Sequence, residues 1–184
     1  MRSVGPRHGR YVVVSGPAAS GKTVLAQALS VELGWPLISK DEIKAALMEV
    51  RTPKTSEDAA AVGRTAMAAL LRLAANTPSG AVLDAVWRRG QGRYELRDLP
   101  GDVVEVFCRC PVAVMRARYA ARSRPERYVS EHRTAEDLWS AETMVPLSRG
   151  WPVIDVDTTG LVDFSVLRKR ISDLFRDHAR RGRS

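Results

Sequence analysis

Short apolar runs that are rich in β-branched residues recur along this chain of 184 residues and alternate with longer segments of helical periodicity. Continuous apolar runs of this kind predict the strands of a parallel sheet that is buried on both faces. The expected strands span residues 11–14, 36–39, 81–86, 103–108 and 152–156.

Helices are predicted around these strands, because apolar residues recur there at intervals of three and four. Gly34, followed by Pro36, is typical of a helix end and closes the first helix. Strands that alternate with helices through right-handed crossovers form a three-layer α/β domain. The apolar helical positions are Leu25, Ala28, Leu29 and Leu33, then Ile43, Leu47 and Val50, then Val62, Ala66, Leu70 and Leu73.

Polar residues around Pro53 predict a loop at 51–56, and we expect Ser56 to cap the helix that follows. The chain shows no internal repeat or composition break, and 45% hydrophobic residues is enough for one core. We therefore expect one domain at 11–178, with a basic arm at 1–10 and a basic tail at 179–184.

The net charge of +8 is concentrated at the ends of the chain. Residues 1–10 hold three arginines and no acid, and residues 168–184 hold seven basic residues against two acidic ones. Residues 11–167 are balanced, with 19 bases and 19 acids. This distribution favours solvated basic ends over a nucleic-acid groove within the domain.

The apolar stretches are too short to cross a membrane, and the first residues lack the apolar stretch of a signal peptide. We therefore expect a cytoplasmic protein with no membrane partner. Cys108 and Cys110 lie two apart in a predicted strand, which is too close for a comfortable disulfide, so we expect both to be reduced.

The segment GPAASGKT at residues 16–23 satisfies the phosphate-binding pattern G-x-x-x-x-G-K-[ST] between a predicted strand and a predicted helix. Its small side chains let backbone N–H groups face an anion, and the helix adds the positive end of its dipole. We expect Lys22 to bridge the β- and γ-phosphates of a nucleoside triphosphate and Thr23 to coordinate Mg²⁺. The expected nucleotide contacts here are Gly16, Pro17, Ala18, Ala19, Ser20, Gly21, Lys22, Thr23 and Val24.

Asp41 follows the second predicted strand, and the carboxyl ends of parallel strands open onto a ligand crevice. A carboxylate beside the γ-phosphate can accept the proton of an attacking hydroxyl and hold that hydroxyl in line. We predict this role for Asp41. The alternative is that Asp41 only caps the helix over residues 42–50.

Asp84 lies in the third predicted strand and has the form of a Walker B acid that binds Mg²⁺. A strand aspartate without a partner would be costly to bury, which favours this role. Trp87 and Arg88 follow near the end of the strand. We predict both as substrate contacts, with a core aromatic as the alternative for Trp87.

An arginine-rich segment after the fourth strand predicts a lid at about residues 116–133. A helix over residues 112–122 would place Arg118 and Arg122 on one face. A lid over a triphosphate would stabilise the transferring phosphoryl group and exclude water, whereas the alternative is a solvated basic helix. We predict Arg122 and Arg124 as catalytic and Arg118 as a nucleotide contact.

The turn after the fifth strand holds Asp157, Thr158 and Gly160. We expect this turn to pass the nucleotide base, with Thr158 as a nucleotide contact, and Asp157 to brace the turn.

With these residues placed, the chain resembles the branch of P-loop kinases that includes chloramphenicol phosphotransferase, zeta toxin and the kinase domain of phage polynucleotide kinase. The resemblance covers about residues 11–160 and rests on GPAASGKT, ISKDEIK, LDAVW and RARYAARSR. It implies a nucleotide-kinase-like P-loop NTPase fold with a five-stranded parallel sheet and an arginine-rich lid. It also implies ATP as donor, Asp41 as general base, Lys44 as a substrate contact and Arg122 as the lid arginine.

The residues and the resemblance together predict ATP-dependent phosphotransfer to a hydroxyl of a small molecule, such as an antibiotic, a nucleoside or a sugar. We expect the alanine-rich helix at 59–75, with Arg64 and Arg72, to form part of the acceptor wall. A polynucleotide 5′-hydroxyl kinase is one alternative, but it requires a basic channel that the neutral region 11–167 does not favour. A nucleotide-dependent switch ATPase is the other, and it would hydrolyse ATP without an acceptor.

Overall fold

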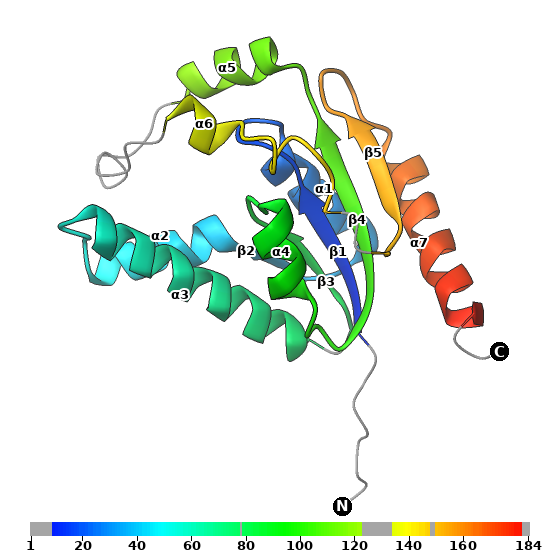
Figure 1. The fold of residues 1–184 in the computed structure, drawn as a ribbon. Helices are drawn as coiled ribbons and strands as arrows, with labels where there is room; N and C mark the ends of the chain where they lie inside the picture. Colours follow the sequence, from blue (N-terminus) through cyan, green and yellow to red (C-terminus); the bar gives the residue numbers. More distant parts are fainter. Residues whose placement is uncertain (1–8, 78, 123–133, 148–149, 182–184) are drawn as a thin grey trace, which may run out of the picture.

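Five parallel strands form one sheet in the order β2-β3-β1-β4-β5 in the computed structural model (Figure 1). The structure describes residues 9–77, 79–122, 134–147 and 150–181. The strands are β1 (Gly9–Ser15), β2 (Leu37–Ser39), β3 (Ala81–Asp84), β4 (Gly101–Arg109) and β5 (Val153–Asp157). The predicted α/β class with a five-stranded parallel sheet is therefore confirmed.

The register of the strands brings the candidate residues to one edge of the sheet. Asp84 of β3 lies opposite Val14 of β1 on one side and Ser39 of β2 on the other. The chain that leaves β1 enters the segment 16–23, and the chain that leaves β2 enters the helix that carries Asp41. This edge faces α5 and α6 in Figure 1.

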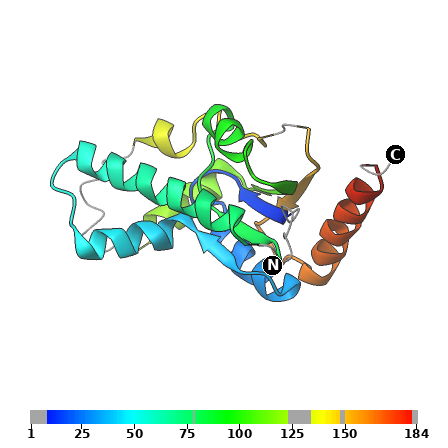
Figure 2. The ribbon, with the colours of Figure 1, turned by 90° about the horizontal axis from the view of Figure 1, so that it is seen from below.

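Helices cover both faces of the sheet (Figures 1 and 2). Val12 and Val14 of β1 pack in a core with residues of α1 and α7, whereas Tyr11 and Val13 pack in a second core with residues of α3 and α4. This alternation follows from the period of two in a strand. The helices are α1 (Lys22–Leu33), α2 (Lys40–Val50), α3 (Ser56–Ala75), α4 (Arg89–Leu96), α5 (Val112–Ala120), α6 (Ala135–Leu138) and α7 (Phe164–Arg181).

Several element boundaries differ from those that the sequence predicts. β1 begins at Gly9, so the last two residues of the predicted basic arm belong to the sheet, and α7 continues to Arg181, three residues into the predicted tail. The remainder of both ends lies outside the described residues. β3 ends at Asp84, two residues earlier than predicted, and no apolar helical positions were predicted for α4. Cys108 and Cys110 are buried and free of a disulfide, as expected.

The cap of α3 is Thr55, and the prediction of Ser56 is wrong by one residue. The Thr55 hydroxyl accepts a hydrogen bond from Asp58 N at 3.1 Å, and the Asp58 carboxylate accepts one from Thr55 N at 3.2 Å. This reciprocal arrangement is a capping box, and it requires the acid three residues after the cap. In the part of the chain that the structure describes, no helix is long and apolar enough to span a membrane.

Candidate active site

The loop between β1 and α1 has a backbone that only small residues allow. Gly16 has φ +132°, and a Cβ atom there would lie 2.8 Å from the carbonyl oxygen of Cys108. Gly21 has φ +89°, and Ala19, with φ 61°, also adopts the left-handed region. These turns place the amino end of α1 at the carboxyl edge of the sheet, where its free N–H groups form an anion site.

Lys22 begins α1, and the residue is 7% exposed. Its Nζ atom donates a hydrogen bond of 2.6 Å to the carbonyl oxygen of Pro17 within the same loop. Burial lowers the pKa of Lys22, while the negative charges of Asp84 and Asp41 raise it and the positive charge of Arg122 lowers it. The lysine is therefore within electrostatic reach of the predicted metal ligand, the predicted base and the predicted lid arginine.

Thr23 and Asp84 form the predicted metal pair. The Thr23 hydroxyl donates a hydrogen bond of 3.0 Å to Asp84 Oδ2. Burial raises the pKa of Asp84, and the charge of Lys22 and the Thr23 hydroxyl lower it. A hydroxyl and a carboxylate are hard oxygen ligands, so the pair fits Mg²⁺. Among the described residues no group of three or more His, Cys, Asp or Glu could hold a metal ion.

Asp41 lies in the first turn of α2 and is exposed. The residue at the N-cap position of this helix is Ser39, so the structure does not support the alternative in which Asp41 is the cap. Lys44 lies one turn further on and is only 5% exposed. Asp41 is thus available to a substrate, whereas the side chain of Lys44 is largely covered by protein.

The described part of the predicted lid is α5 and the two residues that follow it. Arg118 donates a hydrogen bond of 2.8 Å to the carbonyl oxygen of Thr158 and a longer one to the sulfur of Cys110 at 3.6 Å. Arg122 is exposed beyond the end of α5, which ends at Ala120 rather than at the predicted residue 122. Arg124 and the remaining lid residues to 133 lie outside the described residues.

A cavity of about 420 Å³ adjoins residues 16–23, the phosphate-binding loop, on the side of the turn after β5. Thr158 closes this turn against the loop, because its hydroxyl donates a hydrogen bond of 2.6 Å to the carbonyl oxygen of Ser20. Asp157 accepts a hydrogen bond of 2.8 Å from Thr159 N and braces the turn, as predicted. The volume is in the range of small-ligand sites. The lining includes Gly21, Val24, Arg118, Arg122, Thr158 and Leu161.

The family model AAA_33, described as an AAA domain, matches residues 12–144. The chain belongs to this AAA domain family. The matched part of the AAA domain includes the phosphate-binding loop, Asp41, Asp84 and Arg122. Among curated proteins, none matches the chain.

Solved structures of kinases share the fold. A candidate kinase from Chloroflexus aurantiacus is 23% identical with a TM-score of 0.73, over 90% of this chain and 97% of that one. Shikimate kinase from Acinetobacter baumannii, in complex with shikimate, is 19% identical with a TM-score of 0.61, over 94% and 96%. APS kinase from Mycobacterium tuberculosis, in complex with AMPPNP and APS, is 19% identical with a TM-score of 0.61, over 93% and 99%. This AAA domain therefore has the fold of P-loop kinases.

Three further substrate contacts were predicted from the sequence, namely Arg64, Trp87 and Arg88. Trp87 is 2% exposed, and its indole N–H donates a hydrogen bond of 3.2 Å to the carbonyl oxygen of Val14. It is a core aromatic, so the prediction that its ring walls the acceptor is wrong. Arg64 is exposed on α3, and Arg88 is exposed at the N-cap position of α4. Their substrate contacts remain predictions.

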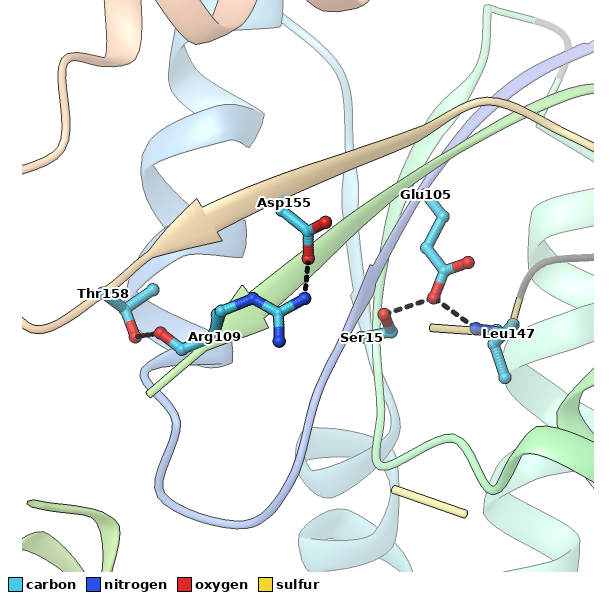
Figure 3. A network of polar contacts seen from close by, with 6 residues as sticks. All are labelled: Ser15, Glu105, Arg109, Leu147, Asp155 and Thr158. Carbon is cyan, nitrogen blue, oxygen red and sulfur yellow. Dashed lines mark hydrogen bonds and ion pairs between the residues drawn. The ribbon is translucent and has the colours of Figure 1, made fainter. Parts of the chain in front are cut away.

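Two residues of this AAA domain support the phosphate-binding loop and were missed from the sequence. Glu105 is fully buried in β4, where its carboxylate accepts hydrogen bonds from Ser15 Oγ at 2.6 Å and from Leu147 N at 2.8 Å (Figure 3). A glutamate within the apolar run 103–108 is a signal that could have revealed it. Trp139 donates a hydrogen bond of 3.1 Å to the carbonyl oxygen of Ala18, and no local sequence pattern predicts this contact.

Figure 3 also shows the carboxyl ends of β4 and β5, on which Arg109 and Asp155 lie. Arg109 forms an ion pair of 2.7 Å with Asp155, and its carbonyl oxygen accepts a hydrogen bond from Thr158 N at 3.1 Å. The turn that borders the cavity is thus attached both to β4 and to the phosphate-binding loop.

Proposed function

We propose that this protein transfers the γ-phosphate of ATP to a hydroxyl group of a small molecule. One observation carries the proposal, namely that the 3.0 Å hydrogen bond from Thr23 to Asp84 joins the loop 16–23 to the edge of the sheet where β2 leads into the helix of Asp41. A site for phosphates, a pair of metal ligands and an exposed carboxylate therefore meet where a phosphoryl group would be transferred.

Each residue has a role that its surroundings support. Lys22 and the amide groups at the start of α1 bind the phosphates, and Arg122 stabilises the charge that develops on the transferring group. Thr23 and Asp84 would hold Mg²⁺, which supplies charge neutralisation of the phosphates when it is bound. Asp41 orients the acceptor hydroxyl and accepts its proton.

The charge distribution supports a small acceptor rather than a nucleic acid. Residues 11–167, which contain every described site residue, carry no net charge. The similar solved structures include a shikimate kinase with shikimate bound and an APS kinase with APS bound. A polynucleotide acceptor would bind through its phosphates, so its binding would weaken steeply with salt. A membership in the chloramphenicol phosphotransferase branch remains a prediction from the sequence motifs.

The acceptor is found by incubating the protein with γ-labelled ATP, Mg²⁺ and a panel of sugars, nucleosides, aminoglycosides and other hydroxyl compounds, followed by mass analysis of the phosphorylated product. A single-stranded oligonucleotide at two salt concentrations is included in the same panel. Transfer to a small hydroxyl compound is the expected result. ATP consumption that no compound raises above its basal rate would instead support the switch ATPase.

The general base is tested with Asp41→Asn. We expect this change to lower kcat by about 10²- to 10⁴-fold, because proton acceptance is lost, while the dissociation constant for ATP stays within about twofold. Glu42→Gln is the matched control, since Glu42 is an exposed carboxylate in the same helical turn. Wild-type kcat in Asp41→Asn would refute the assignment, and Lys22→Ala shows the loss of nucleotide binding for comparison.

A further inference from the structure

The peptide groups of Ala18 are fixed by a segment that is distant in the sequence. Its carbonyl oxygen accepts the hydrogen bond from Trp139 Nε1 at 3.1 Å, and its N–H donates to the carbonyl oxygen of Leu138 at 3.3 Å. Both backbone polar groups of this loop residue are therefore bound to residues 138–139. Loop geometry at Ala18 depends on where that segment lies.

The indole ring of Trp139 is held in turn by α5. Tyr119 meets it edge to face, with ring centroids 5.7 Å apart, and the guanidinium of Arg116 lies 5.6 Å from its centroid. Both contacts are within the range of favourable aromatic and cation–π interactions. Trp139 and Tyr119 also pack against a small apolar cluster that includes Ala19 and Met115. The ring therefore joins the helix that carries Arg118 to the phosphate-binding loop.

The next residue of the loop explains why such support is needed. Ala19 has φ 61°, and a residue other than glycine holds this conformation only where its surroundings impose it. The amide groups that follow Ala19 are those that lead into α1 and face the anion site. Fixing Ala18 fixes the starting point of this strained turn.

We propose that Trp139 is a positioning residue that holds the phosphate-binding loop in its binding geometry before the triphosphate arrives. This inference rests on the proposed function, because it takes residues 16–23 as a phosphate site. A loop that is ordered in advance loses less conformational freedom on binding, so its ligand binds more tightly. The expected gain is in the affinity for the phosphates and not in the affinity for the acceptor.

The test uses Trp139→Phe, which keeps an aromatic ring and removes the N–H donor. Trp35→Phe is a closely matched control, because Trp35 also has a tilted aromatic partner, Phe175 at 5.7 Å, and an arginine, Arg10, at 5.1 Å, but lies in the core formed with α1 and α7. Dissociation constants for Mg·ATP and for magnesium tripolyphosphate are measured by calorimetry. We expect Trp139→Phe to weaken both about three- to tenfold, as for one lost hydrogen bond, and Trp35→Phe to change neither beyond twofold.

Steady-state kinetics separates positioning from general damage. Trp139→Phe should raise KM for ATP while kcat at saturating ATP stays within about twofold, since the transferring groups are intact. Unchanged tripolyphosphate binding in a folded Trp139→Phe would overturn the inference and leave the proposed function standing. A wild-type protein that binds neither ATP nor tripolyphosphate would overturn the proposed function itself.

A second variant decides the question if Trp139→Phe does not fold. Arg116 is exposed, so Arg116→Met removes the cation over the indole ring at little risk to the core. It should speed the hydrogen exchange of the Ala18 amide. An Ala18 exchange rate equal to that of the wild type would refute the positioning role.

Discussion

Lys22 and Asp84 carry opposite charges in a buried site, and burial moves the pKa of each toward the neutral form. Neither residue is placed there for stability, since apolar residues in both positions together would avoid the loss of hydration. Under the proposed function, both would serve a ligand whose phosphates and cation complete the charge balance. The ligand-free protein therefore holds these charges at a cost in folding free energy.

Asp84→Asn is predicted to raise the melting temperature of the nucleotide-free protein and to abolish phosphotransfer. Burial is the main cause of the raised pKa of Asp84, so the folded state holds its proton more tightly than the unfolded state does. The contribution of the Asp84 carboxyl to the free energy of unfolding is therefore lost as pH rises from the unfolded pKa through the raised pKa of the folded state. The neutral asparagine avoids that loss. Each kcal/mol gained corresponds to about 2–4 °C in a chain of this size.

Thermal unfolding across pH checks this prediction. The advantage of Asp84→Asn over the wild type should be present at neutral pH and vanish below the unfolded pKa, where the aspartate is protonated in both states. Asp155→Asn is the control, because the pair of Asp155 with Arg109 is more than half exposed and contributes little. A lower melting temperature for Asp84→Asn at neutral pH would contradict the interpretation.

At the scale of the element, the start of α3 depends on one capping residue. We predict that Thr55→Ala lowers the free energy of unfolding by about 0.5–2 kcal/mol, because the hydrogen bond from Asp58 N is lost. Ser56→Ala should change it by less than about 0.5 kcal/mol, since the described contacts give Ser56 no capping role. Denaturant unfolding of the two variants measures the difference, and equal effects would show that the cap is not Thr55.

The elements that the sequence predicts correctly are those with a strong local pattern. The buried strands are continuous apolar runs, so their type and approximate positions along the chain follow from neighbouring residues alone. No apolar positions were predicted for α4 because Gly90 and Gly92 weaken its helical pattern, and only Gly92 and Leu96 of this helix are buried. Its existence depends on packing against the second core, which a local pattern does not contain.

The residues of the candidate site likewise fall into those that a local pattern predicts and those that depend on distant partners. Lys22, Thr23, Asp41 and Asp84 follow strands or lie in them, so the rule that parallel strands end at one edge predicts their meeting. Trp139 depends on a partner 121 residues away, and nothing near it in the sequence indicates that partner. Trp87 was ambiguous because an aromatic residue at a strand end fits a pocket wall and a core equally well.

At the scale of the whole molecule, Glu105 connects parts of the chain that no short segment joins. Its Oε1 atom accepts hydrogen bonds from Ser15 and from the backbone of Leu147, and its Oε2 atom accepts one from Trp151 Nε1 at 3.2 Å. The carboxylate therefore ties β4 to the end of β1 and to the segment that leads into β5.

Glu105→Gln is predicted to lower the free energy of unfolding by about 1–3 kcal/mol, because the amide NH₂ meets the donor of Trp151 in place of an acceptor. In a Trp151→Phe background that donor is absent, so the same change should cost less. A double-mutant cycle by denaturant unfolding measures the coupling, which we expect at about 0.5–3 kcal/mol. Strictly additive effects would show that the two side chains do not interact.

β1 occupies the middle of the sheet, with β3 and β4 as neighbours, and Val12, Val13 and Val14 are fully buried. An outer strand such as β2, which has only three residues, can separate while the centre stays intact. The phosphate-binding loop leaves the central strand directly, so its anchor belongs to the part of the molecule that opens last. On heating, separation of β2 would first disturb Asp41, which follows this strand. Binding of a triphosphate by the loop 16–23 would persist until the sheet itself unfolds.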